Sequence, residues 1–112
     1  MPTEQRDITD GTLVVQTTTE GDLRTVSLRG ELDLANAGTA EAAIQEALDE
    51  ATQTVVNLTE LEFIDSTGIA LLVGALGHNG DSARLRFVPS RSAAVNRVLD
   101  LTGLSERLPL VE

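Results

Sequence analysis

The four residues Asp65-Ser66-Thr67-Gly68 are the part of this chain best suited to carry chemistry. They precede an apolar stretch whose length, with Ser66 at its entry, favours a helix over a strand. Free backbone amides at a helix N-terminus favour an anion, so they could hold a phosphate on Ser66. Phosphorylation would add about −1.5 to −2 charges beside Asp65. The competing interpretation is that Ser66 or Asp65 only caps the helix, which contributes ~1 kcal/mol.

The expected helix that follows Ser66 is apolar on every side. A surface helix normally carries a polar stripe, and residues 68–77 show none. We take the residues of this helix that face the core to be Ile69, Leu72, Val73 and Leu76. Leu71 and Ala75 then lie together on the opposite side. Either the helix is buried all round, or it exposes an apolar patch that a partner covers. A domain of this size has few places to bury a helix completely, which favours docking of a partner.

Asp33 is the second candidate residue. It ends a strand-like segment, and in a parallel sheet the carboxyl ends of the strands gather at one edge. The linker of residues 59–64 opens at that edge, so Asp33, Asp65 and Ser66 are expected to be neighbours. Asp33 could instead cap the helix that follows it. The lone histidine, His78, is assigned no function.

The composition excludes several classes of function. Eighteen acidic residues face eight basic ones, all Arg, for a net charge of −10, which argues against nucleic-acid and membrane-surface binding. Cys and Lys are absent, which excludes a thiol nucleophile and a lysine Schiff base. A single His is too few for a usual catalytic triad or for a metal site with several His ligands. We expect no enzyme, no cofactor and no metal site. An acidic, polar N-terminus and the lack of a long apolar run predict a cytoplasmic protein.

Strand and helix signals alternate in the order β-β-α-β-α-β-α-β. Polar residues 1–11 lack periodicity, which predicts a flexible N-terminal arm. The expected strands are residues 13–18, 23–29, 54–58 and 83–88, with an edge strand at 107–111. The first expected helix, residues 35–51, buries Ala40, Ile44, Ala47, Leu48 and Ala51. A last helix begins at Ser90 as N-cap and ends at a left-handed Gly103 clasped by Leu104.

These elements predict a single α/β domain. Its sheet is mixed but mainly parallel, with four to five strands, an N-terminal antiparallel hairpin and three to four packed helices.

Three groups of residues, in this order and spacing, resemble the signature of STAS domains. They are residues 30–33 (Gly-Glu-Leu-Asp), residues 55–58 (Val-Val-Asn-Leu) with 63–68 (Phe-Ile-Asp-Ser-Thr-Gly), and residues 98–104 (Val-Leu-Asp-Leu-Thr-Gly-Leu). The three groups resemble more closely those of the stand-alone bacterial anti-sigma factor antagonists, and residues 12–112 are expected to form the STAS domain. Two departures are the short segment 77–82 and the lack of a further C-terminal helix that relatives often carry.

The resemblance implies a partner switch that regulates transcription in the stress response. The unphosphorylated antagonist binds an anti-sigma factor that is also a serine kinase, and a sigma factor is released. The kinase phosphorylates the Ser of the Asp-Ser-x-Gly motif, here Ser66, and the complex separates. A serine phosphatase removes the phosphate and restores the unphosphorylated form that binds the anti-sigma factor. Asp33, Asp65, Thr67 and Gly68 support the acceptor loop.

The resemblance also identifies the apolar helix as the docking element. Its partner-binding residues would be Ile69, Leu71, Leu72 and Ala75, on a monomer or weak dimer. The alternatives are a STAS scaffold that self-associates through this helix and a ligand-sensing module, both without a phosphorylation switch.

Overall fold

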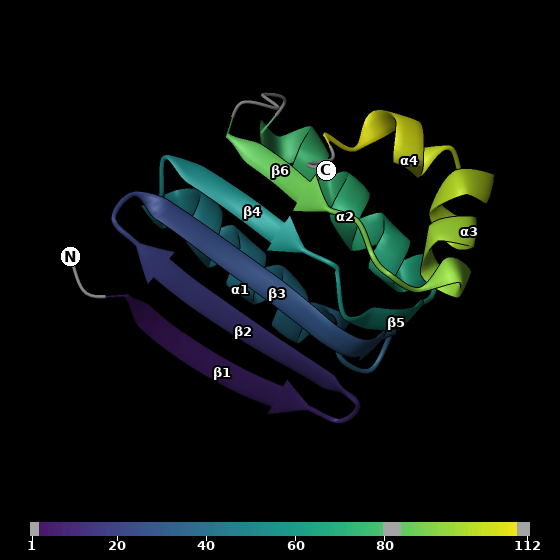
Figure 1. Ribbon diagram of the computed structural model, residues 1–112, viewed down its shortest axis with the longest axis horizontal. Helices are drawn as coiled ribbons and strands as arrows, with labels where there is room; N and C mark the ends of the chain where they lie inside the picture. Colours follow the sequence, from purple (N-terminus) through teal and green to yellow (C-terminus); the bar gives the residue numbers. More distant parts are fainter. Residues whose placement is uncertain (1–2, 80–83, 110–112) are drawn as a thin grey trace.

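The computed structural model describes residues 3–79 and 84–109, in which six strands form one sheet with four helices packed on it (Figure 1). The strands are β1 (Glu4–Asp10), β2 (Leu13–Glu20), β3 (Leu23–Leu32), β4 (Gln53–Asn57), β5 (Leu61–Ile64) and β6 (Leu85–Val88). The helices are α1 (Ala37–Glu50), α2 (Ser66–Asn79), α3 (Ala93–Leu101) and α4 (Leu104–Arg107). None of the described helices is both long and apolar enough to cross a membrane.

The sheet is mixed, as the sequence predicted. Its strand order is β1-β2-β3-β4-β6, and β5 pairs with β3 beyond the end of β4. Strand β2 is antiparallel to both of its neighbours, β1 and β3, whereas β3 runs parallel to β4 and β5, and β4 runs parallel to β6. The chain therefore forms the predicted α/β domain with antiparallel N-terminal strands.

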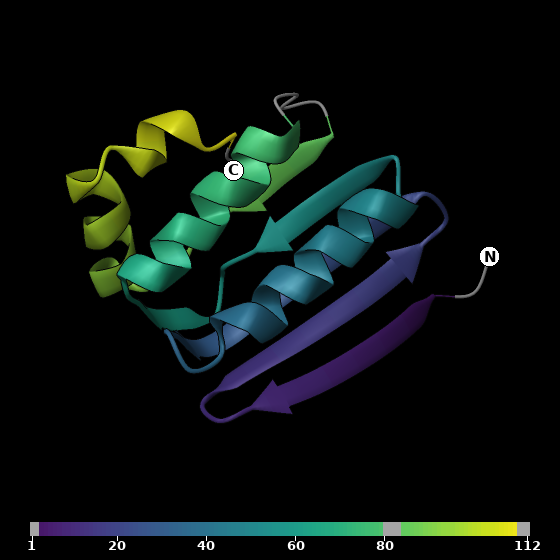
Figure 2. The ribbon, with the colours of Figure 1, turned by 180° about the vertical axis from the view of Figure 1, so that it is seen from behind.

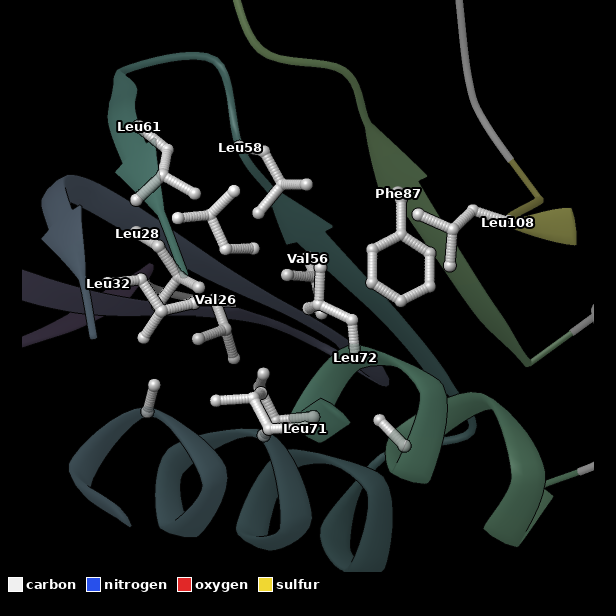
Figure 3. Packing of buried hydrophobic residues seen from close by; sticks show 14 of the residues in the cluster. Val26, Leu28, Leu32, Val56, Leu58, Leu61, Leu71, Leu72, Phe87 and Leu108 are labelled. Carbon is white, nitrogen blue, oxygen red and sulfur yellow. The ribbon is translucent and has the colours of Figure 1, made fainter. Parts of the chain in front are cut away.

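Helices α1 and α2 lie side by side on one face of the sheet (Figure 2). The sheet meets them with the alternate residues of its strands, for example Val15 opposite Leu28 in the register of β2 and β3. The predicted α1 stripe is confirmed, since Ala40, Ile44, Ala47, Leu48 and Ala51 are all buried. Figure 3 shows the core between the two layers, with Val26, Leu28 and Val56 from the sheet and Leu71 and Leu72 from α2.

The N-terminal segment differs from its prediction. The sequence predicts a flexible arm over residues 1–11, but Glu4–Asp10 form β1, which pairs with β2 from Leu13 to Thr19. The side chains of β1 are almost all exposed, so this strand is held by backbone hydrogen bonds and leaves no hydrophobic pattern in the sequence. Thr39 Oγ1 also donates to Asp10 Oδ2 at 2.6 Å and ties the end of β1 to α1.

Two shorter predictions are wrong in detail. The linker of residues 59–64 contains β5, a four-residue strand that takes the place beside β3 that β4 leaves. Ser90 is not the N-cap of α3, because its hydroxyl is buried and donates to Leu61 O at 2.7 Å. The cap is Ser92, whose Oγ accepts from the Val95 amide.

The C-terminal segment follows the prediction only at first. Gly103 has φ of +77° and Leu104 is buried, as expected for the end of α3. The expected edge strand at 107–111 is not formed over its described part, since Arg107 belongs to α4. Pro109 O nevertheless accepts from Phe87 N at 2.9 Å, at the free edge of β6. The structure does not describe residues 110–111 of this expected edge strand. Two other expected segments are described only in part, since residue 83 of the strand at 83–88 and residues 80–82 of the short segment at 77–82 also lie outside the described residues.

A buried hydroxyl on β4 allows a test of the core. Thr54 is 1% exposed, and its Oγ1 has no hydrogen-bond partner among the described residues. Replacing Thr54 by Val keeps the shape and removes an unsatisfied polar atom, so the free energy of unfolding should rise by about 1 kcal/mol. The matched control is Thr39→Val, which breaks the bond to Asp10 and should lower stability instead. Urea unfolding measures the free energy of unfolding of each variant. A Thr54→Val variant that is less stable than the wild type would contradict the prediction.

Candidate functional site

Asp65 stands at the junction of β5 and α2, where it caps the helix. Its Oδ1 accepts hydrogen bonds from the amides of Thr67 at 2.9 Å and Gly68 at 3.0 Å. Ser66 is the first residue of α2, and its side chain is exposed. The sequence analysis predicted that the amides at the helix N-terminus are free and could hold a phosphate on Ser66. The structure corrects this, because Asp65 already occupies the amides of Thr67 and Gly68.

The second carboxylate oxygen of Asp65 connects two loops. Oδ2 accepts from the amide of Leu34 at 3.1 Å, and the Asp65 amide donates to Leu32 O at 3.1 Å. Leu32 ends β3, and Asp33 and Leu34 follow it directly. Asp33, Asp65 and Ser66 therefore meet at the carboxyl ends of β3 and β5, as the sequence predicted.

Asp33 shapes the turn before α1. Its Oδ1 accepts from the Ala35 amide at 3.0 Å, so it braces the turn and does not cap the helix. Sequence reasoning missed Asn36, the buried residue at the N-cap position of α1. Its Oδ1 accepts from the Asp33 amide at 3.0 Å, and its Nδ2 donates to Glu31 O at 2.9 Å. An Asn just before a helix is a sequence signal for such a turn.

Gly68 brings α2 close to the sheet. A Cβ at this position would lie 2.6 Å from Ile64 Cγ1 and 2.9 Å from Leu32 Cγ. Both distances are below van der Waals contact, so a larger residue would push the first turn of α2 away from β3 and β5. The Gly of the Asp-Ser-Thr-Gly segment thus holds the loop at Ser66 through packing, and the amide of Gly68 holds it through the bond to Asp65.

Three of the four predicted partner-binding residues of α2 are buried, which corrects the predicted docking patch. Leu71, Leu72 and Ala75 are only 6%, 0% and 3% exposed, and Ile69 is half-buried against the core. The reason is that α1 packs along one flank of α2 while the sheet covers its base, and Figure 3 shows Leu71 beside α1. These side chains offer little surface to a partner.

Two exposed apolar side chains near Ser66 were missed by the sequence reasoning. Leu34 is 76% exposed and its amide is bonded to Asp65, and Phe63 of β5 is 47% exposed. Large apolar side chains left in water beside a polar loop are common at protein-protein contact sites. Neither position had a sequence signal, because exposure depends on which elements lie next to it.

Comparison with known proteins agrees with this arrangement. The family model described as "Mlab, STAS domain" matches residues 15–112. An anti-sigma-B factor antagonist of Staphylococcus epidermidis is 31% identical over 101 residues, which cover 89% of this chain and 94% of that protein. The names of these relatives describe antagonists of another protein, not catalysts.

Solved structures show the same fold. The crystal structure of an anti-sigma factor antagonist from Mycobacterium paratuberculosis matches with a TM-score of 0.78 and 28% identity, covering 88% of this chain and 84% of that one. The phosphorylated form of the Bacillus cell fate determinant SpoIIAA matches with a TM-score of 0.62 and 21% identity, over 96% of this chain and 89% of that one. Together with the family model, these matches show that the chain belongs to the STAS domain family.

Proposed function

We propose that this protein is an anti-sigma factor antagonist whose binding is switched off by phosphorylation of Ser66. The observation that carries the proposal is the exposed hydroxyl of Ser66 on the first turn of α2, in a loop that Asp65 holds by three hydrogen bonds. The names of the sequence relatives support the antagonist role, and the phosphorylated SpoIIAA structure supports a switch of this kind. The partner is an anti-sigma factor with serine kinase activity, met in the cytoplasm by a monomer or weak dimer.

Ser66 is arranged as an acceptor and not as a nucleophile with its own base. In the phosphoryl transfer, Ser66 Oγ bonds to the γ-phosphorus of ATP, the bond to the ADP oxygen breaks, and the hydroxyl proton passes to a base of the kinase. A serine phosphatase reverses the modification by hydrolysis. Asp33 and Asp65 position the loop through backbone bonds, and they touch no reacting atom.

The capped helix gives a physical reason for release. Because Asp65 occupies the amides of Thr67 and Gly68, a phosphate on Ser66 stays in water beside the Asp65 carboxylate. Closing a partner over Ser66 would strip about −1.5 to −2 charges of their water, at a cost of several kcal/mol. Attraction to a cation of the partner offsets this cost only where the geometry is excellent and further hydrogen bonds satisfy the phosphate oxygens. Desolvation therefore decides the outcome, and the phosphorylated form dissociates.

The test uses the cognate anti-sigma factor with ATP and mass spectrometry. Ser66→Ala should abolish phosphate incorporation, while the neighbouring control Thr67→Ala should still be phosphorylated, because the Thr67 amide that Asp65 holds is retained. Ser66→Asp should bind the anti-sigma factor at least about tenfold more weakly than the wild type, a loss of ~1.4 kcal/mol. Phosphorylation of Ser66→Ala at the wild-type level would refute the site. Unchanged affinity of Ser66→Asp would refute the switch.

A further inference from the structure

A shallow groove lies between the start of α1 and the start of α2. Its volume is about 330 Å³, and its lining residues are Leu34, Ala37, Gly38, Glu41, Thr67, Ala70 and Leu71. Pockets for small molecules usually span about 300–1,000 Å³, so this groove is at the lower limit. It has room for one long side chain rather than for a cofactor.

The groove has an apolar floor and one acidic group at its rim. Ala37 and Leu71 are buried, and exposed Gly38 and Ala70 leave space above them because their side chains are small or missing. Leu34 forms a wall that is 76% exposed. Glu41 is exposed and is the only charged residue among those that line the groove. An occupant that matches this surface has an apolar stem and a cationic end.

The groove is continuous with the proposed phosphorylation site. Ser66 and Ala70 are one helical turn apart on α2, so they lie on the same face. Thr67, which follows Ser66, lines the groove itself. A partner that covers the Ser66 hydroxyl therefore also covers the groove.

We propose that this groove receives an arginine or lysine side chain of the anti-sigma factor, an inference that rests on the proposed function. The aliphatic stem of the side chain packs against Leu34 and Ala70, and its charged end pairs with Glu41. Long cationic side chains bury their stems on apolar surface in this way while the head stays in water. The charge of the chain, −10, attracts such a partner, and the groove lining holds no cation to repel it.

The test measures the affinity of unphosphorylated variants for the cognate anti-sigma factor by calorimetry. Ala70→Leu fills the groove from an exposed position and should weaken binding at least about tenfold. Glu41→Gln should weaken it about threefold to fivefold and reduce its dependence on salt. The matched control is Asp49→Asn, the same change of charge at an exposed site of α1 outside the groove, which should bind within about twofold of the wild type. Circular dichroism confirms that each variant is folded.

Reversal of charge identifies the occupant. Glu41→Arg should bind weakly, and changing one Arg or Lys of the anti-sigma factor to Glu should restore the affinity. Wild-type affinity of both Ala70→Leu and Glu41→Gln would overturn the groove and leave the proposed function standing. An effect of Ala70→Leu alone would overturn the cationic occupant. A wild-type protein that does not bind the anti-sigma factor would overturn both proposals.

Discussion

Replacing Gly30 by Ala should lower the free energy of unfolding by about 3–5 kcal/mol, a large loss for one methyl group. Gly30 has φ of +100°, a conformation that residues with a Cβ rarely adopt. A Cβ at this position would also overlap the carbonyl oxygen of Thr12. That oxygen belongs to the backbone of the β1–β2 turn, so it cannot swing aside as the end of a flexible side chain would. Guanidinium unfolding followed by circular dichroism measures the loss.

Gly30 occupies the point where β3 changes neighbours. Up to Ser27, β3 pairs with β4, and from Gly30 onward it pairs with β5, with a shift in register between Gly30 and Glu31. The Gly30 amide donates to Glu60 O at 3.2 Å, and the Glu31 amide donates to Thr12 O at 3.3 Å. The added methyl group would disturb both bonds. It would therefore displace the end of β3 that carries Asp33.

Gly21 provides the matched control for this prediction. It has φ of +59° in the β2–β3 turn, but a Cβ there would have no atom within 4 Å. Gly21→Ala should therefore cost only the strain of a left-handed residue, about 1–2 kcal/mol. The difference between the two variants reports the contact with Thr12 together with the greater backbone strain of φ +100° over φ +59°. Equal losses would show that backbone strain alone accounts for the effect at Gly30.

Periodic burial explains which parts of the fold could be predicted from the sequence. The α1 stripe that ends at Ala51 repeats with the helical period because it packs on a single surface. Strand β1 has no such pattern, since its stability comes from backbone pairing and its side chains are exposed. Strand β5 was missed for a related reason. Its four residues are too few to show an alternation, and its place depends on where β4 ends.

The candidate site, like the fold, could be predicted from the sequence only in part. The order of the elements placed Asp33 near Asp65, because parallel strands bring their carboxyl ends together. The proposed role of Ser66 came from the resemblance to a known family, since a Ser before a helix is common. The burial of Leu71 and the groove beside Leu34 depend on α1 packing against α2, a contact between distant parts of the chain. The pattern of α2 alone allowed either a buried or an exposed helix.

Replacing Asp65 by Ala should lower stability by about 2–4 kcal/mol and weaken binding to the anti-sigma factor by at least about tenfold. The substitution removes a helix cap, which contributes about 1 kcal/mol, and a charged acceptor of three backbone amides. Without it the first turn of α2 frays, and Ser66 and the Leu34 loop lose their fixed relation. Denaturant unfolding and calorimetric binding, measured below the unfolding transition, test the two effects. Wild-type stability of Asp65→Ala would contradict the capping role.

The variant Asp65→Asn distinguishes the helix cap of α2 from the hydrogen bond to the Leu34 amide. Asn caps helices about as well as Asp, so the cap should be retained. The amide oxygen of Asn can still accept from Thr67 and Gly68, but its NH₂ group would face the Leu34 amide, and two donors cannot pair. Stability should fall by only about 0.5–1.5 kcal/mol, the value of one hydrogen bond. Binding should still weaken markedly, since Leu34 is no longer held beside Ser66. If Asp65→Asn bound the anti-sigma factor as tightly as the wild type, the link between Asp65 and Leu34 would have no part in docking.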